Sequence, residues 1–140
     1  MMKAFLAGAV DFVSAEDATG WRRRAKERLA EAGFDVHDPT ADQDLTRPVE
    51  SYGKVECQQI RNCNHNWVAR NGENAILLVN VTRAGSGTGG EMCEWHRWFG
   101  PDRMVGFGAA GVDAKAVIDA DKLFATEGEA TDYIIARWGK

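Results

Sequence analysis

Residues 75–81 read Ala-Ile-Leu-Leu-Val-Asn-Val, the strongest strand signal in the chain. Successive side chains of a strand point to opposite faces of a sheet, so a strand that is apolar throughout is covered on both faces. This stretch therefore predicts the central strand of a parallel sheet with helices on both sides.

The segment before this strand alternates between strand and helix patterns. Residues 3–7 predict a short buried strand, and residues 34–37 predict a second one. Between them, residues 19–32 predict a helix that ends at Gly33, a residue favoured just after a helix C-terminus. The apolar positions of this helix are Trp21, Ala25, Leu29 and Ala32.

The remaining elements continue the alternation. Residues 40–54 predict a long polar loop, and residues 55–70 a helix with Ile60, Cys63 and Trp67 on one face. After the central strand we expect a loop over 82–90, a helix over 91–99 and a strand over 104–107. A final helix is indicated by a capping box, Thr126 with Glu129. Alternating strands and helices are typical of a parallel sheet.

The sequence thus predicts one domain over residues 1–140. Its expected fold class is α/β, a three-layer α/β/α sandwich with a flavodoxin-like parallel sheet of four to five strands.

Composition limits the possible partners. The chain has 140 residues and a formal net charge of −4, which argues against polymeric nucleic acid as a partner. The basic run Arg22-Arg23-Arg24 is interpreted as a solvated helix face. The N-terminus matches neither a signal peptide nor a membrane span. Three cysteines without paired spacing fit reduced thiols, so we expect a cytoplasmic protein.

The candidate site follows the central strand. Residues 83–90 read Arg-Ala-Gly-Ser-Gly-Thr-Gly-Gly and lead into the helix predicted to begin at Glu91. Glycines let backbone amides approach a ligand, and a helix N-terminus attracts anions such as phosphate. In parallel sheets, ligands bind beyond the carboxyl ends of the strands. We therefore expect a phosphate or sugar to bind here.

Glu91 is the candidate catalytic residue. A carboxylate in the first helical turn can simply favour the helix dipole. Alternatively it can act as the nucleophile of glycosyl transfer, which proceeds through an oxocarbenium-like transition state and a covalent sugar–enzyme intermediate.

Several motifs together resemble the nucleoside 2-deoxyribosyltransferase superfamily, which includes the 2′-deoxynucleoside 5′-phosphate N-hydrolases and related nucleotide N-glycosidases. They are FLAG at 5–8, Trp21-Arg22, Asp38-Pro39, GSGTGGEM at 85–92 and the C-terminal EATDYII. The most specific part is Gly87, Thr88 and Glu91. The resemblance implies cleavage or transfer of the N-glycosidic bond of a nucleoside or its 5′-monophosphate, with Glu91 attacking the sugar.

The resemblance also implies a substrate-binding set and an assembly. Members are typically homodimers or larger, and no cofactor or metal is implied. The set comprises Phe5, Gly8, Asp11, Asp38, Asn80, Gly85, Ser86, Gly87 and Thr88.

The sequence differs from the family at three points. The family tyrosine that helps hold the carboxylate corresponds to Phe5, and the aspartate entering the central strand to Asn74 or Ala75. Gly85 stands where transferases carry an acid, which favours a phosphorylated substrate.

Other interpretations remain. The glycines 85, 87 and 90 match GxGxxG, but the motif lacks the acid that a dinucleotide site requires. A non-catalytic nucleotide-binding module is the main alternative. One acid among Asp38, Asp42 and Asp44 could protonate the leaving base.

The remaining residue types carry weaker signals. Pairs such as Cys93 with His96 and Cys63 with His65 are too few for zinc. Cys93 is interpreted as a buried thiol. Trp21, Trp95, Trp98 and Phe99 are interpreted as packing or interface residues.

Overall fold

The computed structural model describes residues 2–9, 14–41, 51–82, 86–108 and 122–140. Its strands are β1 (Lys3–Gly8), β2 (Asp35–His37), β3 (Ala75–Asn80), β4 (Met104–Phe107) and β5 (Lys122–Phe124). Its helices are α1 (Ala15–Glu31), α2 (Lys54–Asn71), α3 (Ser86–Phe99) and α5 (Glu127–Trp138), with a short 3-10 helix η2 (Gly72–Asn74).

The strands form one parallel sheet in the order β2-β1-β3-β4-β5. This order is that of a flavodoxin-like fold, in which the chain reverses its direction of winding between β1 and β3. The predicted three-layer sandwich is confirmed. The sheet has five strands, within the predicted four to five.

The central position of β3 follows from its sequence. Every residue from Ala75 to Val79 is buried, and Leu77 is in register with Phe5 of β1 and with Met104 of β4. A strand that is apolar on both faces is stable only between two helix layers.

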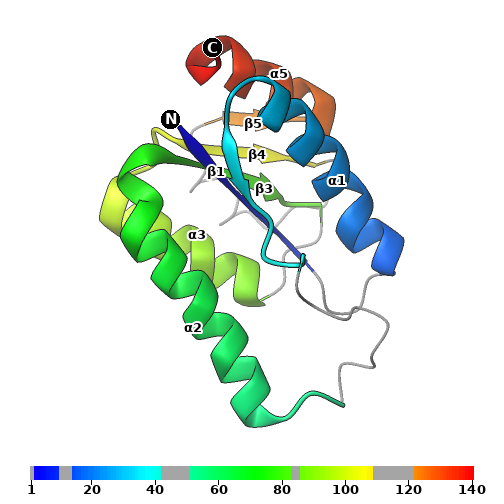
Figure 1. Ribbon diagram of the computed structural model, residues 1–140, viewed down its shortest axis with the longest axis vertical. Coiled ribbons are helices and arrows are strands. Elements are labelled where there is room, and N and C mark those ends of the chain that lie inside the picture. The colour runs from blue at the N-terminus through cyan, green and yellow to red at the C-terminus, as the bar shows by residue number, and fades with distance from the viewer. Residues whose placement is uncertain (1, 10–13, 42–50, 83–85, 109–121) are drawn as a thin grey trace.

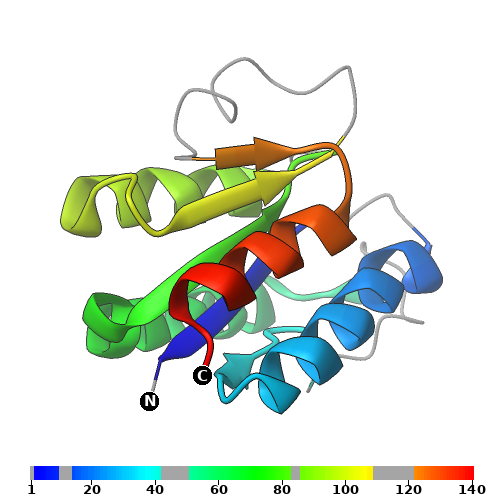
Figure 2. The ribbon, with the colours of Figure 1, turned by 90° about the horizontal axis from the view of Figure 1, so that it is seen from above.

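Two hydrophobic clusters lie on the two faces of the sheet, and Figure 2 shows α1 and α5 on one side of it and α2 and α3 on the other. On one face, α1 and α5 pack through residues such as Trp21, Leu29 and Ile134. On the other face, α2 and α3 contribute Val68, Met92, Trp95 and neighbouring side chains. In Figure 1, α2 extends well beyond the sheet, and Val68 is its one buried residue.

Two predicted helix starts were wrong. Helix α1 begins at Ala15, because Ser14 accepts a hydrogen bond from the Asp17 amide and caps the helix. Helix α3 begins at Ser86 rather than Glu91, so three glycines lie inside it. Burial of Met92 and Trp95 outweighs the low helix propensity of those glycines.

The predicted end of α1 and the predicted start of α5 agree with the structure. Gly33 has a φ of 92°, and Thr126 accepts from the Glu129 amide, as expected of both caps. No strand was predicted over residues 122–124, where β5 lies, because this edge strand is largely exposed and lacks an apolar run. Within the described ranges, no helix has the length and apolar character needed to cross a bilayer.

We expect Leu77→Ala to lower the free energy of unfolding by about 2–5 kcal/mol, because it leaves a cavity between two helix layers. Urea denaturation would measure the change. The matched control is Leu123→Ala on the edge strand β5, where the leucine is 39% exposed. There we expect a loss below about 1 kcal/mol. Equal losses in the two variants would contradict the central position of β3.

Candidate active site

The carboxyl ends of β1 and β3 lie side by side at one edge of the sheet. Gly8 is in register with Asn80, the last residue of β3. A Cβ atom at Gly8 would lie 3.0 Å from Cζ2 of Trp21 and 3.1 Å from Cβ of Asn80. Because only glycine fits here without a shift, helix α1 can pack closely over the end of β1.

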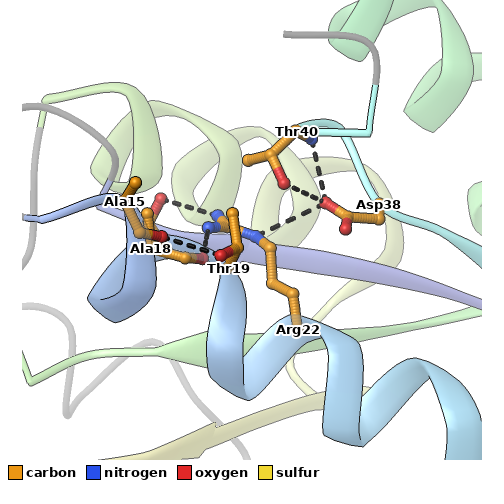
Figure 3. A network of polar contacts seen from close by, with 7 residues as sticks. Ala15, Ala18, Thr19, Arg22, Asp38 and Thr40 are labelled. Carbon is orange, nitrogen blue, oxygen red and sulfur yellow. Dashed lines mark hydrogen bonds and ion pairs between the residues drawn. The ribbon is translucent and has the colours of Figure 1, made fainter. Parts of the chain in front are cut away.

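Asp38 reaches the same edge from β2. It follows His37 directly, and its Oδ1 accepts hydrogen bonds from Thr40 N (2.9 Å) and Thr40 Oγ1 (2.7 Å). Oδ1 also lies 3.7 Å from Nε of Arg22. Figure 3 shows this network, in which the Arg22 side chain points toward Asp38. Asp38 is thus fixed by its neighbours as a hydrogen-bond acceptor.

Arg22 is the residue that sequence analysis misplaced. Arg23 and Arg24 are exposed as expected, but the Arg22 side chain is only 1% exposed. Its Nη2 donates to the Gly8 carbonyl oxygen at 2.9 Å, and its Nη1 donates to the Ala18 carbonyl oxygen. The spacing of Ala18, Arg22, Ala25 and Leu29 gives a reason, since it places Arg22 on the apolar side of the helix.

Glu91 lies in the second turn of α3, because the helix begins at Ser86. The predicted position in the first turn was therefore wrong. Its side chain is half-buried. Burial raises the pKa of Glu91 from 4.5 to about 7; Arg22 opposes this rise and Glu94 adds to it.

A carboxylate with a pKa near 7 is poised between its acid and base forms at neutral pH. Groups with such perturbed pKa values cluster at functional sites. Glu91, Arg22 and Asp38 therefore form the candidate site, together with Gly8 and Asn80.

Phe5 packs among aromatic rings. Its ring is fully buried, with its centroid 5.2 Å from that of His37 and 5.4 Å from that of Trp67. The rings of His37 and Trp67 stack with centroids 4.8 Å apart and an angle of 15°. Sequence analysis did not single out His37, the last residue of β2.

Other predicted residues fall in different places. The Asn80 side chain accepts from the Thr82 amide at 3.1 Å. Ser86, Gly87 and Thr88 form the start of α3. Asp11, Asp42, Asp44 and Gly85 lie outside the described residues. Asn74 precedes β3 and Ala75 begins it, so both lie at the amino end of the strand, whereas the candidate site lies at its carboxyl end.

The aromatic residues mostly pack, as expected. Trp21 and Trp95 are buried and Phe99 is partly buried, whereas Trp98 is 41% exposed.

The cysteines differ from prediction. Cys93 is exposed rather than buried, and Cys63 is exposed on α2 because the inner face of that helix is formed by Val68 and Trp67. Among the residues with described positions, no group of three or more acidic, histidine or cysteine side chains could hold a metal ion.

Comparison with known proteins gives a clear result for the fold. No family model and no curated protein sequence matches the chain. A conserved protein from Enterococcus faecalis V583 is similar in structure, with a TM-score of 0.72 and 12% identity, over 98% of this chain and 99% of the other. A second solved structure with the same fold is a 2-deoxyribosyltransferase.

That enzyme comes from the psychrotolerant bacterium Bacillus psychrosaccharolyticus. The TM-score is 0.66 at 16% identity, over 94% of this chain and 91% of the enzyme. The predicted resemblance to the nucleoside 2-deoxyribosyltransferase superfamily is thus confirmed at the level of the fold.

We expect Glu91→Gln to stabilise the protein at alkaline pH but not at acidic pH. The folded protein retains a proton on Glu91 between pH 4.5 and about 7, whereas the unfolded chain has released it. Stability therefore falls as the pH rises through this window, by up to about 3 kcal/mol. The glutamine carries no such penalty. Thermal unfolding at pH 4 and pH 8 would measure the difference.

The control for this variant is Glu73→Gln, which removes an exposed carboxylate from η2 at the other edge of the sheet. It should show no comparable pH-dependent gain. If the wild type and Glu91→Gln have parallel stability curves from pH 4 to 8, the pKa of Glu91 is not raised.

Proposed function

We propose that the protein cleaves or transfers the N-glycosidic bond of a nucleoside or its 5′-monophosphate, with Glu91 as the nucleophile. The observation that carries this proposal is the position of Glu91. Its half-buried carboxylate belongs to the helix that follows the central strand, and burial raises its pKa to about 7 against the opposing effect of Arg22. Ligands bind at this edge of the sheet in flavodoxin-like folds.

The proposed chemistry has two steps. First, a carboxylate oxygen of Glu91 attacks the anomeric carbon, the bond to the base nitrogen breaks, and the leaving base takes up a proton from solvent. Water or a second base then attacks the same carbon and loses a proton to solvent, and the bond to the Glu91 oxygen breaks to release the carboxylate. A negative charge beside the sugar stabilises the oxocarbenium-like transition state of both steps.

The proposed substrate contacts follow from the same edge. Gly8 and Asn80 border the space above the ends of β1 and β3, and residues 85–88 stay predicted contacts for the 5′ end of the sugar. The N-terminus of α3, which begins at Ser86, is the kind of helix end that attracts a phosphate. Three unpaired cysteines support a cytoplasmic location. Assembly into a homodimer stays a prediction.

A non-catalytic nucleotide-binding module is the second candidate. It is favoured by Phe5, whose ring carries no hydroxyl and packs against the rings of His37 and Trp67. Binding of nucleotides without turnover would support it.

We expect the wild-type protein to release free base from a panel of nucleosides and nucleoside 5′-monophosphates, measured by chromatography. Because the attacking oxygen is lost, Glu91→Ala should reduce the rate by at least about 1,000-fold with the fold retained. Glu73→Gln is the control and should keep full activity. Normal turnover by Glu91→Ala would exclude Glu91 as the nucleophile.

We also expect kcat/KM to rise with pH through an apparent pKa of about 7. Only the ionised carboxylate can attack the sugar, so the acidic limb reports the deprotonation of the nucleophile in the free enzyme. A pH–rate profile from pH 5 to 9 would measure it. A limb near pH 4.5, the ordinary value for glutamate, would contradict the effect of burial.

A further inference from the structure

Asp38, which follows β2 at the carboxyl end of the sheet, is held through one of its two oxygens. Its Oδ1 accepts hydrogen bonds from Thr40 N at 2.9 Å and from Thr40 Oγ1 at 2.7 Å, and Nε of Arg22 lies 3.7 Å from the same atom. Figure 3 shows these contacts converging on a single oxygen. Within the described ranges, no hydrogen bond or ion pair reaches Oδ2, and the Asp38 side chain is 13% exposed. Asp38 thus presents one acceptor in a fixed direction.

The donors that face Oδ1 are themselves fixed. Thr40 is buried, and the amide that donates to Asp38 belongs to its backbone. Arg22 is 1% exposed, and its guanidinium donates to the carbonyl oxygens of Gly8 and Ala18. A backbone amide and a guanidinium can only donate, so both require an acceptor at the position of Oδ1.

The same contacts connect Asp38 to the ends of β1 and β3. Gly8 ends β1 in register with Asn80, and a Cβ atom at Gly8 would lie 3.5 Å from Nη2 of Arg22 and 3.1 Å from Cβ of Asn80. Strands β2 and β3 both pair with β1, so they lie about 10 Å apart. A nucleoside spans such a distance from its sugar to the far edge of its base.

The proposed reaction sets the direction of a nucleoside across this edge. Displacement at the anomeric carbon places the leaving base on the side opposite the attacking oxygen. Glu91 belongs to α3, which follows β3, so the base is directed away from α3 and toward the ends of β1 and β2. The 5′-phosphate is excluded from the place beside Asp38, because two negative charges repel each other.

We propose that Asp38 is a specificity-determining residue that contacts the base: its Oδ2 accepts a hydrogen bond from an exocyclic amino group, so the protein prefers adenine or cytosine to hypoxanthine or uracil. This inference rests on the proposed function, because the direction of the base follows from attack by Glu91. A keto oxygen in place of the amino group faces the carboxylate as a second acceptor, and the two acceptors repel each other.

The first test compares bases that carry either an amino group or a keto oxygen at one ring position. Adenine and hypoxanthine form one such pair, and cytosine and uracil form the other. For the 2′-deoxynucleoside 5′-monophosphates, we expect kcat/KM to be about tenfold or more higher with the amino base of each pair, because a hydrogen bond to a charged acceptor is otherwise lost. Chromatography of the released base measures the ratio. Equal values within both pairs overturn the proposal.

Asp38→Asn gives a sharper test, because the structure fixes how the new amide is oriented. The Thr40 amide and Nε of Arg22 require an acceptor, so the amide oxygen occupies the place of Oδ1 and the NH₂ group that of Oδ2. The group that faces the base changes from acceptor to donor, and the preference should invert in favour of the keto bases. Asp38→Ala, which offers neither group, should accept the two bases of each pair within about threefold.

The matched control is Asp35→Asn. It removes the same charge from an exposed residue at the amino end of β2, and it should keep the wild-type preference. An equal loss for all four bases in Asp38→Asn overturns the proposal, because Asp38 would then contact the sugar or only support the fold. The wild-type comparison does not depend on whether the Asp38 variants fold.

A binding measurement separates this inference from the proposed function. Calorimetric titration of Glu91→Gln with the same four nucleotides reports the preference without cleavage. A preference for the amino bases in binding, with no base release by the wild type, overturns only the proposed reaction. Base release by the wild type without any preference overturns only the role of Asp38. Failure of all four nucleotides to bind or react overturns both.

Discussion

The pairing of β1 with β3 is the constraint on which the rest of the molecule depends. Six residues of each strand are in register, from Lys3 with Ala75 to Gly8 with Asn80. The two strands end level at Gly8 and Asn80, and the helices that come next in the chain pack on opposite faces of the sheet. Helix α1 turns to one face and α3 to the other. In open parallel sheets, ligands bind beyond the carboxyl ends of the strands, which is where β1 and β3 end.

Burial and neighbouring charges have opposite effects on the pKa values of Glu91 and Arg22. Protein atoms around Glu91 disfavour its ionised form, whereas Arg22 favours it. The effect of burial is the larger one, so the pKa of Glu91 lies at about 7 rather than at the value of a solvent-exposed acid. A similar balance applies to Arg22, whose pKa is lowered by burial and raised by Asp38 and Glu91. A buried charge is costly by itself, and the opposite charges nearby reduce that cost.

The fold was predicted well from the sequence because its signals are local and periodic. The apolar run of β3, the helical spacing of α1 and the capping box of α5 each depend on residues close in the chain. Ser14 and Ser86 mark earlier helix starts than predicted. Ser14 was assigned to a loop, and the glycines after Ser86 suggested another. Tertiary packing overrides such weak local preferences.

The site was predicted only in part, because its geometry depends on contacts across the sequence. Glu91 was identified through its motif, but Arg22 was assigned to a solvated face. In a run of three arginines, composition does not distinguish the one that turns inward. The helical spacing from Ala18 to Leu29 contained that information. The partners of Arg22 could not be inferred locally, since Gly8 and Asp38 lie 14 and 16 residues away in sequence.

The exposure of α2 has a consequence for the dynamics of the molecule. An 18-residue helix that buries only Val68 gains little from packing, and short helices in water are only marginally stable by themselves. Local opening of this helix costs less free energy than opening of the central strands. Trp67 leaves the His37 and Phe5 rings when α2 detaches. Local opening of α2 thus uncovers the rings of Phe5 and His37 and leaves the β1–β3 pairing, which holds Gly8 and Asn80, in place.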